Sequence, residues 1–442
     1  MKKRLGHTVG IYTLGCKVNQ YESEAIAEVL ESNGISVISP SSVCDAYIIN
    51  TCTVTAESDR KARQFIRRAI SKNPDAYIIV TGCFAQTSPD DIAKIDGVNF
   101  ICGNGEKMLA AHKLIDFFDG IAKKDNAEIC VNDIFNAGFE DMSIKKFDRT
   151  RAYVKIEDGC ENRCSYCIIP SARGKVRSKA PHKIIAEVEE LTKNGCKEIV
   201  LTGIETASYG KDLDGVTLAD LLCKIDKIEG IGRIRLGSLD PSLITPSFVN
   251  KISKLKSLAP HFHLSLQSGS SRILALMRRK YNADMAMKSI ELLRENMPNV
   301  CFTTDVIVGF PQETEEDFKE SAEFIKKAKF LMVHVFPYSQ RKGTEAAKMN
   351  GQIDSAEKTR RLHELEEIEK NCRNELLNDL IKKEPQKKIL FETFDGKYAH
   401  GHTDNFLEVA VPSSRDLRGE ILSVSITETD GNICFGNIID NR

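Results

Sequence analysis

Short β-branched hydrophobic runs alternate with amphipathic segments along the first 120 residues. Each run is followed by a polar turn, and segments such as 57–73 and 106–120 then carry apolar residues at helical spacing. This alternation predicts a βαβ order and a parallel sheet. We therefore expect a doubly wound α/β domain over residues 5–120, with strands in HTVGIYTLG, DAYIINTC and AYIIVTGC.

A second alternating region begins at Arg151, after a polar, irregular stretch at about 121–148 that is typical of a linker. Six hydrophobic runs with helical segments between them predict an open (β/α)6 barrel over residues 146–376. Its strands are expected in AYVKIEDGC, EIVLTGIE, RIRLGSL, HFHLSLQSG, VCFTTDVIVGF and LMVHVFPYS.

The pattern changes near the C-terminus. A long charged helix is predicted from Asp354 to about Lys382. Short hydrophobic runs separated by Gly and Asp turns follow, in KKILFETF, YAHGHTDNFLEVAV and GEILSVSITETDGNICFGNII. They predict a small all-β barrel over residues 380–442.

Charge and hydropathy restrict the partners. The 442-residue chain has a net charge of −1, so any nucleic-acid or membrane surface must be a local patch. No run approaches the roughly 18 apolar residues of a membrane span. The N-terminal MKKRLGHTVGIYTLGC loosely resembles a lipoprotein signal, but its apolar stretch is short and Thr13 replaces a large aliphatic residue. We expect no targeting signal and a cytoplasmic protein.

Fourteen cysteines are present. In a reducing compartment they are expected to be free thiols, metal ligands or redox groups rather than disulfides. Eight of them are expected to act as small core hydrophobes: Cys44, Cys102, Cys130, Cys196, Cys223, Cys301, Cys372 and Cys434.

Three cysteines, Cys160, Cys164 and Cys167, directly follow the first predicted barrel strand. Active sites of (β/α) barrels lie at the C-terminal ends of their strands. Thiolates suit an iron–sulfur cluster, and three protein ligands leave one iron of a cubane open to a substrate. A zinc site with a distant fourth ligand is the alternative interpretation.

Three further cysteines, Cys16, Cys52 and Cys83, each follow a predicted strand of the first domain. Carboxyl ends of parallel strands share one edge of a sheet, so these thiols are expected to converge and to hold a second cluster. Ordinary buried cysteines or a flavodoxin-like phosphate site are the alternatives, although no Gly-rich loop stands at this edge.

The CxxxCxxC stretch resembles the signature of the radical S-adenosylmethionine superfamily. The whole chain resembles its methylthiotransferase family, through TLGCKVNQYESE, NTCTVTAESDRKARQ, TGCFAQ, GCENRCSYCIIPSARGKVRS, LQSGSSRILALMRRKY and DVIVGFPQETEEDF. The resemblance implies a C-terminal TRAM domain and two [4Fe–4S] clusters. GCKVNQYES, LTGIETASYGKDL and MRRKY are most similar to the branch acting on threonylcarbamoyladenosine beside the tRNA anticodon, whereas IIPSARG is closer to the ribosomal-protein branch.

The resemblance also implies a mechanism. The Cys16, Cys52 and Cys83 cluster carries an added sulfur, which one S-adenosylmethionine methylates. A second is cleaved at the Cys160, Cys164 and Cys167 cluster, and the radical removes hydrogen from C2 of the adenine. An electron donor such as flavodoxin or ferredoxin is expected, and the sequence does not identify the sulfur source. The C–H bond offers no acidic proton, so the cofactors carry the difficult step.

Further pocket residues are expected at the ends of barrel strands. Gly203 and Glu205 would contact the amino group of S-adenosylmethionine, and Ser238 and Gln267 would line the cavity. Glycines at strand ends are also common turn formers. Phosphate contacts are expected from the basic segments DRKARQFIRR (with Arg60, Arg63 and Arg67), ARGKVRSK and MRRK, and a solvated surface is the alternative.

Three other functions remain open at the level of sequence. Two are enzymes of the same family, which modify isopentenyladenosine in tRNA or a ribosomal protein. The third is a non-enzymatic iron–sulfur or zinc scaffold that binds RNA. Cleavage of S-adenosylmethionine under reducing conditions would exclude the scaffold.

Overall fold

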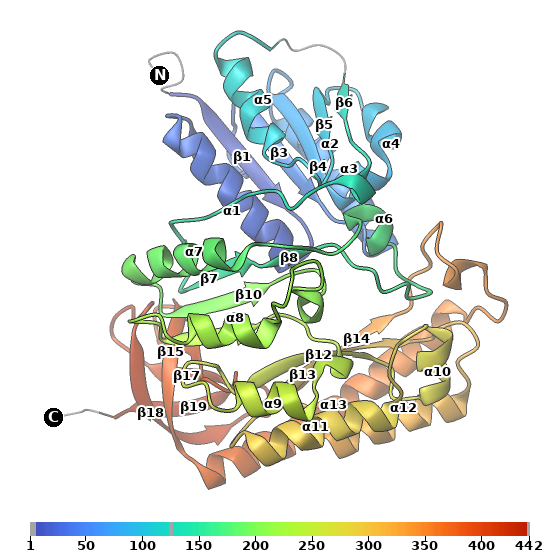
Figure 1. Cartoon of the computed structure of the whole chain (residues 1–442), viewed down its shortest axis with the longest axis vertical. Coiled ribbons are helices and arrows are strands. Elements are labelled where there is room, and N and C mark those ends of the chain that lie inside the picture. Colours follow the sequence, from blue (N-terminus) through green and yellow to red (C-terminus); the bar gives the residue numbers. More distant parts are fainter. Residues whose placement is uncertain (1–5, 123–126, 148, 440–442) are drawn as a thin grey trace.

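The computed structural model describes residues 6–122, 127–147 and 149–439. Figure 1 shows three parts: an N-terminal sheet domain in blue, a central core in green and yellow, and a C-terminal barrel in red beside the core. The N-terminal domain lies above the core in this view, and α1 and the linker run along the contact between the two. No helix in the described ranges combines the length and apolar composition needed to cross a bilayer.

The N-terminal domain is built on a six-stranded parallel sheet in the order β2-β1-β3-β4-β5-β6. The central strands β3 and β4 are buried at every position, which explains their apolar runs AYII and YIIV. The strands are β1 (Thr8–Thr13), β2 (Ser36–Ile38), β3 (Ala46–Thr51), β4 (Tyr77–Gly82), β5 (Phe100–Cys102) and β6 (Glu128–Cys130).

Helices cover both faces of this sheet. One core contains Ile26 and Leu114, from α1 (Lys17–Ser32) and α5 (Leu109–Phe118). The other contains Ile66 and Ile92, from α2 (Ala56–Lys72) and α4 (Pro89–Ala93). The predicted doubly wound arrangement is therefore confirmed.

The stretch predicted as an irregular linker takes part in the fold. It supplies β6, whose three residues pair with β5 and are too short a run for the periodicity to identify. A 3-10 turn follows at Ile134–Asn136. Beyond it, the backbone of Met142 accepts a 2.8 Å hydrogen bond from the Tyr21 hydroxyl, so the segment lies in the interface between the two domains.

Six parallel strands form the central core. They pair as β11-β10-β7 and β12-β13-β14, and bridges Ile234–Leu258 and Leu239–Leu264 join the two sheets. Among the described residues no pairing joins β7 to β14, so the barrel is open as predicted. The strands are β7 (Arg151–Lys155), β10 (Glu198–Thr202), β11 (Arg233–Leu236), β12 (His261–Gln267), β13 (Cys301–Val308) and β14 (Met332–Pro337).

Helices on the outside of the barrel pack their apolar faces against these strands, in one continuous core. They are α7 (Pro181–Lys193), α8 (Leu218–Ile225), α9 (Pro246–Ile252), α10 (Ser271–Leu276), α11 (Ala283–Asn296) and α12 (Glu315–Ala328). A short excursion between β7 and α7 carries the first cysteine motif: β8 (Glu157–Asp158), α6 (Ile169–Arg173) and β9 (Arg177–Ser178).

The long helix α13 (Ser355–Lys383) leads to the C-terminal domain. Five strands close into a barrel in the order β15-β16-β17-β19-β18, as expected of a TRAM domain. They are β15 (Gln386–Phe394), β16 (Tyr398–His402), β17 (Glu408–Pro412), β18 (Ile421–Thr429) and β19 (Cys434–Ile438). The barrel docks on the core through Phe406, whose ring stacks on His261 at 4.5 Å.

Candidate active site

The N-terminal cysteines lie at one edge of the sheet. Cys16 precedes α1, Cys52 follows β3 and Cys83 begins α3 (Cys83–Thr87) directly after β4. Because β1, β3 and β4 are neighbouring parallel strands, these three ends come together. Burial raises the pKa of Cys52 to about 11, and the thiols of Cys83 and Cys16 add to that rise. The predicted convergence of the strand ends is therefore present.

One side chain ties two of these loops together. The Asn19 amide donates hydrogen bonds to the backbone oxygens of Leu14 (2.7 Å) and Thr51 (2.9 Å), which lie just before Cys16 and Cys52. Asn50 in turn donates to the backbone oxygen of Asn19 at 2.9 Å. The side chains of Asn19 and Asn50 are fully buried, so these hydrogen bonds hold the two loops at a defined separation.

The Cys83 loop is held against the same strand. The Thr51 hydroxyl donates to the Thr81 carbonyl at 2.6 Å and accepts from the backbone N–H groups of Phe84 and Ala85. Gly82 has a φ of +97°, and a Cβ there would lie 2.4 Å from the Thr51 oxygen. Only glycine permits this close approach of β4 to β3 beside the cysteines.

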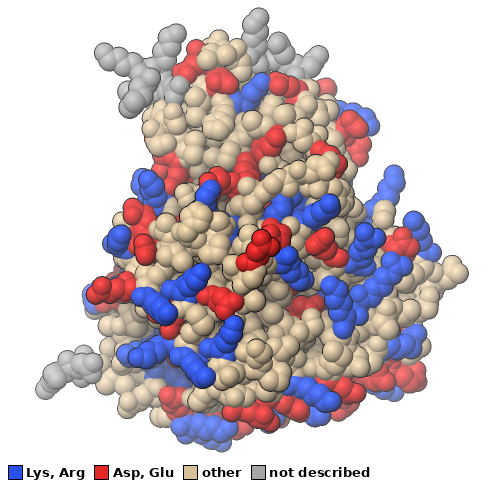
Figure 2. Space-filling model, viewed as in Figure 1, with Lys and Arg blue, Asp and Glu red and all other residues tan. Residues whose placement is uncertain are grey.

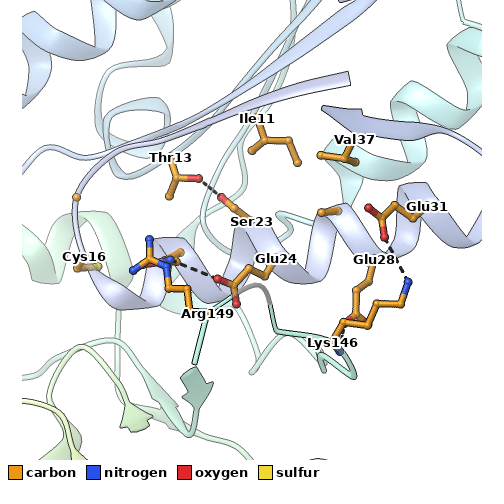
Figure 3. A pocket seen from close by; sticks show the side chains of 13 residues that line it. Ile11, Thr13, Cys16, Ser23, Glu24, Glu28, Glu31, Val37, Lys146 and Arg149 are labelled. Carbon is orange, nitrogen blue, oxygen red and sulfur yellow. Dashed lines mark hydrogen bonds and ion pairs between the residues drawn. The ribbon is translucent and has the colours of Figure 1, made fainter. Parts of the chain in front are cut away.

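Cys16 is solvent-exposed and also borders a separate cavity of about 360 Å³. Figure 3 shows this cavity beside α1, with Thr13 hydrogen-bonded to Ser23 on one wall and Arg149 and Lys146 of the linker on the other. Cys16 alone of the N-terminal triad lines this cavity, whereas Cys52 and Cys83 are buried.

The second triad lies in the loop between β8 and α6. Burial raises the pKa of both Cys160 and Cys167 to about 12. The guanidinium of Arg279 donates from Nη1 to Cys164 Sγ at 3.3 Å, and from Nη2 to Asp240 at 2.9 Å. A cation with a side chain only 6% exposed therefore stands beside the sulfurs, and it opposes the rise in the pKa of Cys167 that burial causes.

A cavity of about 720 Å³ extends from this triad. Cys160, Cys164 and Cys167 line it together with Glu205, which follows β10, and Gln267 at the end of β12. Val54 and Thr55 of the N-terminal domain also line it, and they follow Cys52 by two and three residues. One cavity therefore has Cys160, Cys164 and Cys167 on one wall and the loop that follows Cys52 on another.

The other predicted pocket residues differ in placement. Glu205 and Gln267 line the cavity. Gln267 has a φ of +69°, an uncommon conformation for a residue with a side chain, at an irregularity of β12. Gly203 lies outside the lining, and a Cβ there would meet Glu157 Oε2 at 2.6 Å. Ser238 is exposed at the end of β11 and does not line the cavity.

Glu205 is the strongest candidate for a ligand-binding carboxylate. Its Oε2 accepts from Asn162 at 3.2 Å, whereas Oε1 is buried without a hydrogen-bond partner among the described residues. Burial raises its pKa to about 7, and the neighbouring Asp240 carboxylate adds to the rise. An arriving ammonium group would satisfy the unpartnered oxygen and stabilise the charged form.

This pKa predicts the pH dependence of stability of the protein without cofactors. The folded state holds the Glu205 proton up to about pH 7, whereas the unfolded chain releases it at lower pH. The free energy of unfolding should therefore fall as the pH rises to about 7, by at most about 1.4 kcal/mol per pH unit, and then level off for this group.

The measurement is urea unfolding of the wild type and Glu205→Gln at pH 5.5 and pH 8. The wild type should lose more stability between the two conditions than the variant. Equal losses would show that Glu205 is ionised throughout the range.

The donor sets fit iron–sulfur clusters. Each triad offers three thiols that are soft ligands, and each has a buried cation nearby, Arg173 beside Cys16 and Arg279 beside Cys164. Within the described ranges no three His, Cys, Asp or Glu side chains are close enough to share a single metal ion. A cubane binds each thiolate through a separate iron.

The phosphate contacts expected from ARGKVRSK are wrong for Arg173, Arg177 and Lys179. In ARGKVRSK the side chains of Arg173, Arg177 and Lys179 are buried, where they pair with carboxylates. In MRRK, Arg279 faces Cys164, while Arg278 and Lys280 are exposed. Figure 2 shows basic and acidic side chains mixed over most of the face, with basic ones gathered near the loop that follows β14. A count of basic residues could not tell a buried ion pair from a surface patch.

Sequence reasoning also missed Asn19, Arg173 and Arg279 as parts of the site. Asn19 lies within GCKVNQYES, which served to identify Cys16 and the family resemblance, and Arg173 lies within ARGKVRSK, where a phosphate contact was expected. The signals available in the sequence were Asn19, three positions after Cys16, and Arg173, six positions after Cys167. Neither stands out, because helix surfaces usually tolerate many residue types. Their partners are distant in sequence, so only the fold identifies them.

The family comparisons agree with this geometry. Residues 154–325 match the model of the radical SAM superfamily, and residues 8–103 match that of the uncharacterized protein family UPF0004. The solved structure of the radical S-adenosylmethionine methyltransferase TsrM from Kitasatospora setae has a TM-score of 0.58, with 15% identity, over 78% of this chain and 77% of that one. This likeness concerns the fold alone.

Whole-length relatives are more similar in sequence. The threonylcarbamoyladenosine tRNA methylthiotransferase MtaB of Bacillus subtilis (strain 168) is 41% identical over 426 residues, 95% of this chain and 93% of the relative. MtaB of Aquifex aeolicus (strain VF5) is 37% identical, over 95% and 100%. A tRNA-2-methylthio-N(6)-dimethylallyladenosine synthase of Moorella thermoacetica is 34% identical, over 98% of each chain.

The open barrel with its cysteine triad and adjoining cavity defines a radical S-adenosylmethionine enzyme. Its cofactors are [4Fe–4S] clusters and S-adenosylmethionine. The N-terminal cysteine triad and the C-terminal barrel indicate one family within this superfamily. The chain belongs to the methylthiotransferase family of radical S-adenosylmethionine enzymes.

Proposed function

We propose that the protein transfers a methylthio group to C2 of N6-threonylcarbamoyladenosine beside the anticodon of tRNA. Cys160, Cys164 and Cys167 hold the cluster that binds S-adenosylmethionine, and Cys16, Cys52 and Cys83 hold the second. The observation that carries the proposal is the 720 Å³ cavity that reaches both the radical triad and the loop of Cys52. The relatives named for this nucleoside, at 41% and 37% identity, support the choice of substrate.

The two cysteine triads have separate tasks that one site cannot combine. When bound, the clusters and S-adenosylmethionine supply the 5′-deoxyadenosyl radical and the methylthio group. The chain keeps the two triads on different domains, and the loop that follows Cys52 reaches the cavity lined by Cys160, Cys164 and Cys167. Ile169, Ile204 and Ile307 give this space apolar walls, which exclude water from a reactive radical.

Polar side chains at the cavity wall orient what binds there. Glu205 offers its unpartnered Oε1 to the ammonium group of S-adenosylmethionine. Arg279 is fixed by Asp240 and by a 3.1 Å hydrogen bond to the Ser265 carbonyl, so it holds Cys164 in place. Gln267, held in a strained conformation, presents its amide to the same space.

Two partners complete the proposal. The tRNA anticodon loop presents a partly unpaired adenosine, so the cost of extruding it is small. Reductive cleavage needs a one-electron donor of low potential, such as flavodoxin or ferredoxin.

The test is a reaction of the reconstituted enzyme with tRNA that carries threonylcarbamoyladenosine, followed by nucleoside mass spectrometry. We expect its 2-methylthio derivative as product, and none with tRNA carrying isopentenyladenosine or with ribosomal protein. Product on isopentenyladenosine alone would assign the protein to the other tRNA branch. Cleavage of S-adenosylmethionine with no methylthio product on any of the three would refute the transfer.

A further inference from the structure

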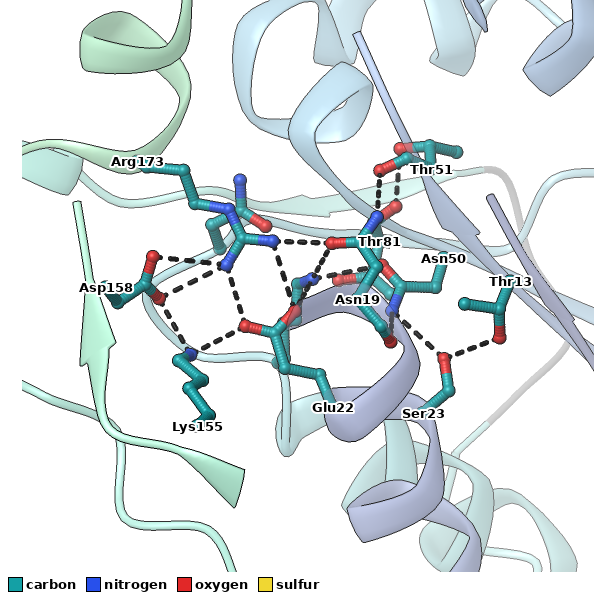
Figure 4. A network of polar contacts seen from close by, with 12 residues as sticks. Thr13, Asn19, Glu22, Ser23, Asn50, Thr51, Thr81, Lys155, Asp158 and Arg173 are labelled. Atoms are coloured by element: carbon teal, nitrogen blue, oxygen red, sulfur yellow. Dashed lines mark hydrogen bonds and ion pairs between the residues drawn. The ribbon is translucent and has the colours of Figure 1, made fainter. Parts of the chain in front are cut away.

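A buried network of charged side chains lies behind the N-terminal triad and reaches the radical core. Figure 4 shows Glu22 and Asn19 of α1 facing Arg173 of α6, with Lys155 and Asp158 of the core alongside. Glu22 and Arg173 have fully buried side chains. The Arg173 guanidinium donates from Nη1 to Glu22 Oε1 at 2.7 Å and to Asp158 Oδ2 at 3.2 Å.

This network reaches the loops of Cys16 and Cys52 and the segment that carries Cys160, Cys164 and Cys167. Arg173 Nη2 donates to Asn19 Oδ1, the other end of the amide that bridges the loops of Cys16 and Cys52. Arg173 follows Cys167 by six residues, and its partner Asp158 precedes Cys160 by two. A single side chain is thus bonded to both domains beside both triads.

Positive charge exceeds negative charge in this buried space. Among the residues that the structure describes, four cations form ion pairs within 4 Å with two carboxylates, Glu22 and Asp158. The cations are Lys107, Lys155, Arg173 and Arg177. Another nearby carboxylate, Glu140, accepts from the backbone N–H groups of Lys107 and Met108 instead.

Two of these cations, Arg173 and Lys107, lie near the N-terminal cysteines. Arg173 lies within electrostatic reach of Cys16 and Cys83, and Lys107 of Cys83. Arg173 Nε–H is buried and has no hydrogen-bond partner among the described residues. A cluster bound by three thiolates is negatively charged, and buried positive charge and N–H donors stabilise its reduced form.

We propose that Arg173 is a positioning residue for the N-terminal cluster. It fixes the Asn19 bridge between the Cys16 and Cys52 loops, ties that bridge to the segment that carries the radical triad, and supplies countercharge to the cluster. Its loss lowers the reduction potential of this cluster and loosens the hold of the protein on it. The inference rests on the proposed assignment of Cys16, Cys52 and Cys83 as ligands.

The experiment uses the full chain with Cys160, Cys164 and Cys167 replaced by alanine, so that only the N-terminal cluster remains. Arg173→Gln and Arg173→Lys are compared with Glu187→Gln in this background. Glu187 is also buried between the domains, where it accepts from Tyr21 and Lys179, so it controls for weakening the interface. The readouts are the midpoint potential from an optical redox titration and the rate of iron loss to a chelator.

Arg173→Gln is expected to shift the midpoint potential to more negative values and to speed iron loss severalfold. Arg173→Lys keeps the charge but not the fork of hydrogen bonds, so its potential stays near that of the parent while iron loss still accelerates. Glu187→Gln should change neither.

Parental potential and parental iron loss in both Arg173 variants would overturn the inference. If Arg173→Gln does not fold, iron loss from Arg173→Lys decides the question in the same way. A parent protein that binds no iron would instead refute the ligand assignment in the proposed function.

Discussion

Alanine at Cys160, Cys164 and Cys167 is expected to abolish both cleavage of S-adenosylmethionine and formation of the methylthio nucleoside. These thiols are the ligands proposed for the cluster at the wall of the 720 Å³ cavity, and no other cysteine in the described part of the chain lines that cavity. Without the cluster, no electron reaches the sulfonium and no radical forms. Mass spectrometry of 5′-deoxyadenosine and of the tRNA nucleosides measures both losses.

Alanine at Cys16, Cys52 and Cys83 should separate the two reactions. Cleavage of S-adenosylmethionine should persist, because the radical triad and Glu205 lie in the other domain, whereas the methylthio product should vanish. Iron per chain should fall from about eight to about four in either triple variant. Cys44→Ala and Cys301→Ala, which remove buried thiols outside both triads, should keep the full iron content.

Full iron in the Cys16, Cys52 and Cys83 variant would show that these thiols are not ligands. The methylthio transfer would then lose its second cluster, and the protein would be a radical enzyme with another product. Loss of S-adenosylmethionine cleavage in that variant would mean that the two triads depend on each other for folding. A normal near-UV circular dichroism spectrum would exclude that cause.

The placement of both triads was predictable from sequence because it depends on local patterns. A strand pattern that ends in cysteine, as in AYIIVTGC, fixes the residue at the carboxyl end of that strand. Parallel topology then brings Cys16, Cys52 and Cys83 to one edge without knowledge of any contact. Cys160, Cys164 and Cys167 lie within one loop, so their proximity follows from their spacing alone.

The polar support of the site was not predictable in this way. Arg173 looked like a surface cation because its sequence neighbours are basic, and its partners Glu22 and Asn19 lie about 150 residues away. Ser238 looked like a pocket residue from its strand, but the end of β11 leaves it in solvent. Contacts between distant segments decide these cases, and a period of two or 3.6 residues carries no information about them.

Glu22→Gln is expected to destabilise the protein strongly, by about 3–5 kcal/mol, through the charge that it leaves unpaired. The Glu22 carboxylate pairs with Lys107, Lys155 and Arg173, and its side chain is fully buried. These cations hold its pKa well below the usual range against the opposing effect of burial. An amide of the same shape keeps the packing but leaves three buried cations with one carboxylate fewer. Urea unfolding of the wild type and the variant at pH 7 measures the loss.

Two further variants test whether the loss of stability comes from charge. Glu31→Gln changes an exposed carboxylate on the same helix, 3.6 Å from Lys146, and should cost less than about 1 kcal/mol. Adding Lys107→Met to Glu22→Gln removes one surplus cation, so the double variant should recover part of the lost stability. If the double variant is instead less stable by the sum of two separate losses, the network acts through shape and hydrogen bonds. In that case, only the midpoint potential of the Arg173 variants would test the countercharge role of Arg173.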